Sequence, residues 1–111
     1  MEIPEEILAE CHAHGVDAYP EETCGFITGN RDDPNSLETV WPMLNIMNEL
    51  HEKDPAQYPR TARDGYVIDP LEQLKLERSL KKEGKEIKVI YHSHPDVGAY
   101  FSEKDKKDAL W

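Results

Sequence analysis

Two histidines near the end of the chain are spaced as ligands of one metal ion. His92 and His94 are separated by a single residue, and Ser102 and Asp105 follow them. Imidazole nitrogens and carboxylate oxygens bind zinc, and three protein ligands leave the fourth tetrahedral position open to water. Zinc in such a site lowers the pKa of its water to about 7, which provides hydroxide at neutral pH. The spacing therefore predicts a hydrolytic metal site on His92, His94 and Asp105.

The elements around the histidines should bring these groups together. A β-branched and aromatic run from Glu86 to Tyr91 predicts a strand, and residues two apart on a strand share a face. Pro95 ends that strand, and a loop over residues 96–101 leads to a helix beginning at Ser102. Asp105 would lie in its first turn, where the positive helix end favours a carboxylate. The alternative is a strand, a turn and a capping box of Ser102 with Asp105, without metal.

The chain contains a second His-x-His pair, for which we do not predict a metal site. His12 and His14 lie in a helical pattern, where residues two apart point to different sides and cannot easily chelate one ion. We interpret them as surface or hydrogen-bonded histidines. Ser93 should point away from its flanking histidines and serve structure, and Asp96 is typical of a turn.

The C-terminal motif resembles the signature of the JAMM (MPN+) metallopeptidases. Seven residues separate His94 from Ser102 and two separate Ser102 from Asp105, and the signature runs without a gap through His92-Ser93-His94-Pro95. The family also places a glutamate after its first helix in a Pro-x-Glu-x-x-Gly context, which is similar to Pro20-Glu21-Glu22-Thr23-Cys24-Gly25 here. Glu22 takes the matching position, and the short form is most similar to the prokaryotic members.

The resemblance implies zinc on His92, His94 and Asp105. It also implies that Glu22 is the general base, which accepts a proton from the water and returns it to the leaving amine. Ser102 would donate a hydrogen bond to the oxyanion. From the residues alone, we would expect Glu22 to be a solvated surface carboxylate beside Glu21, and only one of the two can face the metal.

The substrate that the resemblance implies is the C-terminal tail of a ubiquitin-like or sulfur-carrier protein, cleaved at an amide or isopeptide bond. Two alternatives stay open. One is a non-catalytic MPN-type module that binds such tails and keeps zinc for structure. The other is a RadC-like role in DNA metabolism, against which stand the acidic composition and Ser93, where that group has Asn.

Composition limits the partners. The 111 residues predict one domain, residues 1–111, and the formal net charge of −10 argues against nucleic acid and anionic membranes. Cys11 and Cys24 should pack as small apolar groups, with thiols reduced in a cytoplasmic protein. The acidic N-terminus predicts neither a signal peptide nor a membrane anchor. The sequence leaves the oligomeric state open.

The remaining patterns predict an α/β fold. We expect a helix from Pro4 to Gly15, strands over 23–28 and 37–44, a short strand over 66–68, and a helix that Gly84 closes. The order indicates a single-domain sandwich of a mixed sheet with flanking helices, and the family implies a cytidine-deaminase-like version of it. The buried helix faces should be formed by Ile3, Ile7, Leu8 and Cys11 and by Leu71, Leu74, Leu76 and Leu80.

Two further features concern the loop and the end of the chain. Residues 45–64 show no periodicity and predict a structureless segment, either a flap over the substrate tail or a loop without a role. Trp111 follows Ser102 by only nine residues, whereas domains of the family usually continue through further strands. We therefore expect a longer natural chain or a sheet that closes unusually.

Overall fold

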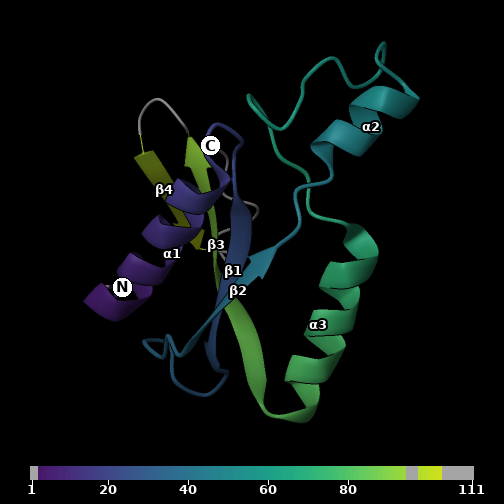
Figure 1. Ribbon diagram of the computed structural model, residues 1–111. Helices are drawn as coiled ribbons and strands as arrows, with labels where there is room; N and C mark the ends of the chain where they lie inside the picture. The colour runs from purple at the N-terminus through teal and green to yellow at the C-terminus, as the bar shows by residue number, and fades with distance from the viewer. Residues whose placement is uncertain (1–2, 95–97, 104–111) are drawn as a thin grey trace.

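The protein is a four-stranded sheet with helices on both faces. The computed structural model describes residues 3–94 and 98–103, with side chains described for 3–93 (Figure 1). The helices are α1 (Glu5–Ala18), α2 (Met47–Lys53) and α3 (Pro70–Lys82). The strands are β1 (Cys24–Asn30), β2 (Thr39–Met43), β3 (Lys85–His94) and β4 (Gly98–Glu103).

The strands lie in the order β2-β1-β3-β4. All three pairings are antiparallel. The α/β class with flanking helices is confirmed, but the parallel pairing that a mixed sheet requires does not occur between the described strands. Pro42 lies on the edge strand β2, as expected of a residue that cannot donate to a ladder.

Each face of the sheet has its own apolar core. On the face of α1, Ile7 and Cys11 pack with three buried strand residues, namely Ile27, Val89 and Tyr91. On the face of α3, Leu80 packs with Phe26 and Ile87. A bulge after Ile27 shifts the register of β1 against β3, so that Ile87 faces α3 although Val89 faces α1.

Helix α1 is longer than predicted. Gly15 was expected to end it, but the helix continues to Ala18 and stops before Pro20. Gly15 instead lies within the helix beside Ser93, where a Cβ would make an ordinary van der Waals contact at 3.4 Å from the Cβ of Ser93. Ile7 and Cys11 are buried as predicted, whereas Leu8 is 39% exposed.

Helix α3 begins and ends as its sequence predicts. The Asp69 side chain accepts a hydrogen bond from the Leu71 backbone N–H at the N-cap, and Gly84 follows the helix with a φ of 70°. The predicted leucine face is only half correct. Leu80 is buried and Leu76 partly so, but Leu71 and Leu74 are 64% and 44% exposed.

The end of the described chain is a strand over residues 98–103, where we expected a loop and the first residues of a helix; the rest of that predicted helix, residues 104–111, lies outside the described residues. Strand β4 pairs with the outer edge of β3, and Ser102 lies opposite Ile90. Ser102 is therefore not a helix cap. The aromatic Tyr100 and Phe101 favour a strand, and both lie in register with β3, opposite His92 and Tyr91. The sequence pattern of a Ser-x-x-Asp cap was outweighed by that pairing.

The segment between β2 and α3 is more ordered than predicted. Helix α2 occupies part of residues 45–64, at the upper right of Figure 1. The short strand expected over 66–68 is absent from this described segment, and Ile68 forms only an isolated bridge with Asn45.

No helix among the described residues is long and apolar enough for a bilayer crossing.

Candidate functional site

A buried carboxylate and a buried imidazole meet at one end of the sheet. Glu22 precedes β1, and His92 lies near the end of the adjacent strand β3. Their side chains are 5% and 7% exposed, and Glu22 Oε1 lies 3.5 Å from His92 Nδ1. Buried ionisable groups in contact are uncommon and mark candidate functional sites. The fold thus joins two groups that are 70 positions apart in the sequence.

The backbone around Glu22 is held from the segment between β2 and α3. The Glu22 N–H donates to the carbonyl of Ala62, and the Glu22 carbonyl accepts from the Asn45 amide at 2.9 Å. The neighbouring Glu21 is exposed and accepts a hydrogen bond from the Asn48 amide at 2.9 Å. Of the two glutamates, the fold therefore turns Glu22 inward and Glu21 outward.

The His92 ring is confined by its neighbours. The ring of Tyr66 stacks on it with a centroid distance of 4.7 Å and an interplanar angle of 23°. In the sheet, His92 lies between Cys24 of β1 and Tyr100 of β4. A ring packed in this way has few orientations available to it, which is what a metal ligand or a proton-transfer partner needs.

Ser93 faces away from this site and holds the start of β1. Its hydroxyl oxygen accepts hydrogen bonds from the backbone N–H of Thr23 at 2.8 Å and from the Thr23 hydroxyl at 3.0 Å. The Ser93 N–H donates to the Thr23 carbonyl at 3.0 Å. The structural role predicted for Ser93 is confirmed, and it fixes the residue that follows Glu22.

The cysteines are unsuited to act as nucleophiles. Burial raises the pKa of the Cys24 thiol to about 12, and the nearby charge of Glu22 adds to the shift. Burial and the charge of Glu10 raise the pKa of Cys11 to about 11. Both thiols stay protonated at neutral pH and pack in the interior as predicted.

The other predicted ligands are only partly described. His94 ends β3 two residues after His92, but its side chain lies outside the described residues. Asp105 lies outside them altogether. The backbone of Ser102 lies beside Ile90, about 7 Å along β3 from His92. Among the described residues no three His, Cys, Asp or Glu side chains cluster as metal ligands.

The two histidines of the earlier pair have different surroundings. His14 Nδ1 lies 2.9 Å from the hydroxyl of the buried Tyr91, and burial lowers the pKa of His14. His12 is exposed. The interpretation of this pair as surface or hydrogen-bonded histidines is confirmed.

Sequence patterns did not single out Tyr66 or Asn45. Tyr66 lay in a run expected to be a strand, and Asn45 lay at the start of a segment expected to have no structure. An asparagine after a strand often bonds nearby backbone, which is the only signal the sequence offered. Which backbone it bonds depends on the tertiary fold.

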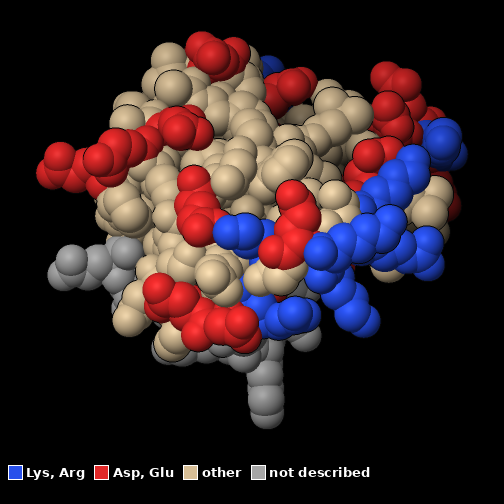
Figure 2. Space-filling view, turned by 90° about the horizontal axis from the view of Figure 1, so that it is seen from below, with Lys and Arg blue, Asp and Glu red and all other residues tan. Residues whose placement is uncertain are grey.

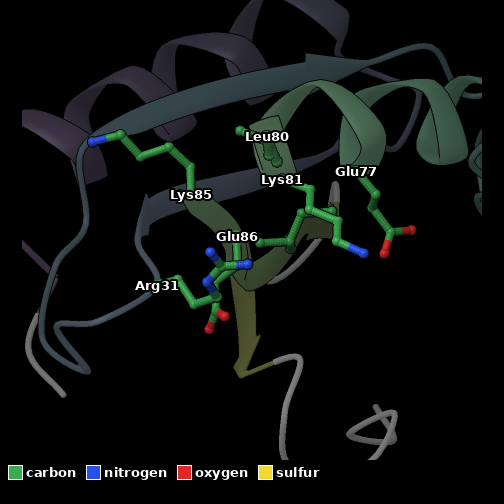
Figure 3. Close-up of a pocket in the computed structure, with 7 residues that line it drawn as sticks. Arg31, Glu77, Leu80, Lys81, Lys85 and Glu86 are labelled. Carbon is green, nitrogen blue, oxygen red and sulfur yellow. The ribbon is translucent and has the colours of Figure 1, made fainter. Parts of the chain in front are cut away.

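The opposite end of the sheet has a hollow of different character. Its charged lining residues have both signs, as Figure 3 shows, and they are Arg31, Lys81, Lys85, Glu77 and Glu86. Figure 2 views the molecule from this end, where lysines and arginines gather on one side among scattered acidic residues. Lys85 pairs with Glu38, and Glu86 with Lys88. Because charges of both signs line it and two are already paired, this hollow does not define a ligand site.

Comparison with known proteins identifies the family. Residues 4–110 match the family model described as prokaryotic homologs of the JAB domain. The match covers nearly the whole chain, so this protein belongs to that family. The resemblance to the JAMM (MPN+) proteins, and to their prokaryotic members in particular, is confirmed.

Individual relatives point the same way. The chain is 36% identical over 109 residues to a protein of Thermus thermophilus named a probable TtuB-protein conjugate cleaving protease, covering 98% of this chain and 63% of that protein. It is 32% identical over 95 residues to the CysO-cysteine peptidase of Mycobacterium tuberculosis, covering 86% of this chain and 56% of the peptidase. The chain thus spans less than two thirds of either relative.

A solved structure supports the fold. The solution structure of protein DSY2949 from Desulfitobacterium hafniense aligns with a TM-score of 0.63 and 28% identity. The alignment covers 96% of this chain and 65% of that one. The sheet and its flanking helices are therefore shared with an experimentally determined protein.

Proposed function

We propose that this protein is a zinc-dependent hydrolase that cleaves an amide or isopeptide bond at the C-terminal tail of a ubiquitin-like or sulfur-carrier protein. The contact that carries this proposal is the one between Glu22 and His92. A base far from the metal-binding imidazoles would make hydrolysis untenable. The fold instead holds the carboxylate 3.5 Å from His92, in a buried setting.

The donors at this end of the sheet fit zinc on chemical grounds. His92 offers a buried imidazole at a strand end, with a carboxylate beside it to orient the site. In the proposal, His92, His94 and Asp105 hold the ion. Zinc supplies Lewis acidity to the scissile carbonyl and to water when it is bound.

The protein's own residues would move the protons and bind the developing charge. The Glu22 carboxylate accepts a proton from the attacking water and delivers it to the leaving amine. The Ser102 hydroxyl donates a hydrogen bond to the oxyanion. Burial of Glu22 keeps bulk water from competing for that proton.

The named activities of the relatives support a peptidase, and the protonated thiols of Cys11 and Cys24 argue against a cysteine nucleophile. We place the protein in the cytoplasm, where its buried free thiols stay reduced.

The test uses the isosteric variant Glu22→Gln and a carrier protein whose Gly-Gly tail is extended by an amine-linked residue. Glu22→Gln should retain zinc, measured by elemental analysis, and lower kcat by about 10²- to 10⁴-fold, because general-base catalysis contributes that much. His92→Ala should lose both zinc and cleavage. A chelator should abolish cleavage by the wild-type protein, and added zinc should restore that cleavage.

Glu21→Gln is the matched control, because Glu21 is the adjacent but exposed carboxylate. It should cleave within about twofold of wild type, since an exposed polar change has a small effect. Cleavage by Glu22→Gln at the wild-type rate would remove Glu22 as the base. Tail binding without cleavage under any condition would instead favour the non-catalytic binding module.

A further inference from the structure

One asparagine side chain connects three segments beside the candidate site. The amide nitrogen of Asn45 donates to the carbonyls of Glu22 at 2.9 Å and Gly65 at 3.1 Å. Its oxygen accepts from the backbone N–H of Met47 at 3.0 Å and of Val67 at 3.2 Å. A side-chain amide has two donor hydrogens and an oxygen with two lone pairs, so these four bonds use its full capacity.

The bond to Glu22 matters because it fixes a residue on an irregular part of the chain. Residues 21–23 belong to no helix or strand, so no ladder holds the Glu22 peptide in place. Its N–H is taken by the carbonyl of Ala62 and its carbonyl by Asn45. Both anchors come from the segment that joins β2 to α3, which thereby sets where the Glu22 carboxylate points.

The same amide also positions the other neighbour of His92. Gly65 and Val67 flank Tyr66, and Asn45 bonds the backbone of both. The Tyr66 ring stacks on His92 from this anchored stretch. One side chain therefore holds the carboxylate and the aromatic ring that contact the His92 imidazole.

We propose that Asn45 is a positioning residue for the hydrolysis proposed above, and the inference rests on that function. It acts through Glu22 and Tyr66 and does not contact the substrate. A general base works only within hydrogen-bond reach of its proton, and a displacement of about 1 Å can lower the rate by about 100-fold. Loss of the Asn45 amide should therefore affect turnover more than substrate binding.

The test is Asn45→Asp, which keeps the shape of the side chain and both acceptor contacts. It removes the two donors and sets a carboxylate oxygen against the carbonyls of Glu22 and Gly65. We expect kcat to fall by about tenfold or more with KM within about twofold. The rate of amide hydrogen exchange at Glu22, relative to wild type, should rise at least tenfold more than the rate at the hydrogen-bonded amides of β1. Those β1 amides report global unfolding.

Asn48→Asp is the matched control in the same segment. The Asn48 amide donates to the exposed Glu21, while its oxygen accepts from the Ala62 N–H, a contact that Asp retains. Both kcat and Glu22 exchange should stay within about threefold of wild type. An equal loss of kcat in the two variants would overturn the proposal.

The exchange measurement separates this inference from the proposed function. If the wild-type protein cleaves no carrier conjugate, the function fails, but faster exchange at Glu22 in Asn45→Asp still supports the anchoring role. If Glu22 exchanges no faster than the β1 ladder in that variant, Asn45 only contributes to global stability. That result overturns the positioning role whether or not the protein cleaves conjugates.

Discussion

The ion pairs described at the two ends of the β1–β3 strand pair differ in how far their side chains are buried. At one end Glu22 and His92 are buried in contact with each other. At the other, Lys85 pairs with Glu38, and their side chains are 33% and 43% exposed. Lys85 and His92 are seven positions apart on β3, which is about 23 Å along the strand.

The difference shows that contact between two buried ionisable groups distinguishes the candidate site, because Lys88 is also buried but pairs with the exposed Glu86. Water and salt screen the exposed pair, so it contributes about 0–1 kcal/mol to the free energy of unfolding. Buried ionisable groups cost desolvation energy and need fixed partners, so a fold that keeps them must position them closely. The bonds of Asn45 and Ala62 to Glu22 provide that positioning.

The largest loss of stability should come from a methyl group added at the site end, compared with one added at the other end. At the site end, a Cβ on Gly25 would lie 2.5 Å from ring atoms of Tyr91, which is 1% exposed and bonded to His14. Gly25→Ala should therefore lower the free energy of unfolding by about 3 kcal/mol, because a packed ring cannot yield without strain.

The control for that change is Gly84→Ala at the other end. Its Cβ would meet nothing within 4 Å, so only the positive φ opposes it, at about 1 kcal/mol. Urea titration of both variants measures the difference. Equal losses would mean that the two ends are packed alike.

A pH effect should come from His14 on the α1 side of the core. Burial lowers its pKa below the ordinary value of 6.5, so the unfolded chain binds more protons just below that pH. The stability present above about pH 6.5 should thus be lost as pH falls through the folded-state pKa. In His14→Gln, unfolding measured between pH 7.5 and 5.5 should depend less on pH, and an unchanged slope would contradict the assignment.

The smallest effect should be that of Lys85→Ala. Because the Lys85 pair with Glu38 is partly exposed, its loss should lower the free energy of unfolding by about 0.5 kcal/mol. The difference from wild type should shrink further in about 1 M salt. A loss above about 2 kcal/mol would show that this end, too, depends on a desolvated charge.

Local sequence signals predicted much of the fold. The β-branched run before the histidines became β3, and Asp69, Pro70 and Gly84 marked the ends of α3. These signals act within a few residues, through strand propensity, capping and backbone freedom.

Local sequence patterns gave wrong predictions where contacts between distant residues decided the structure. The pattern from Ser102 resembled a helix cap, but pairing of β4 with β3 decided for a strand. Residues 45–64 lacked periodicity because their order depends on side-chain bonds from Asn45 and Asn48 to distant backbone, and not on a buried stripe. Such bonds leave no repeating pattern in a sequence.

The types and spacing of His92, His94, Ser102 and Asp105 are properties of the sequence alone, and they predict the class of chemistry proposed above. Only the tertiary structure decided which glutamate lies beside His92. Glu21 and Glu22 are chemically equal, and the choice between them depends on backbone bonds to Ala62 and Asn45, 40 and 23 residues away. Contacts across such separations form only when the sheet and the segment from β2 to α3 have folded together.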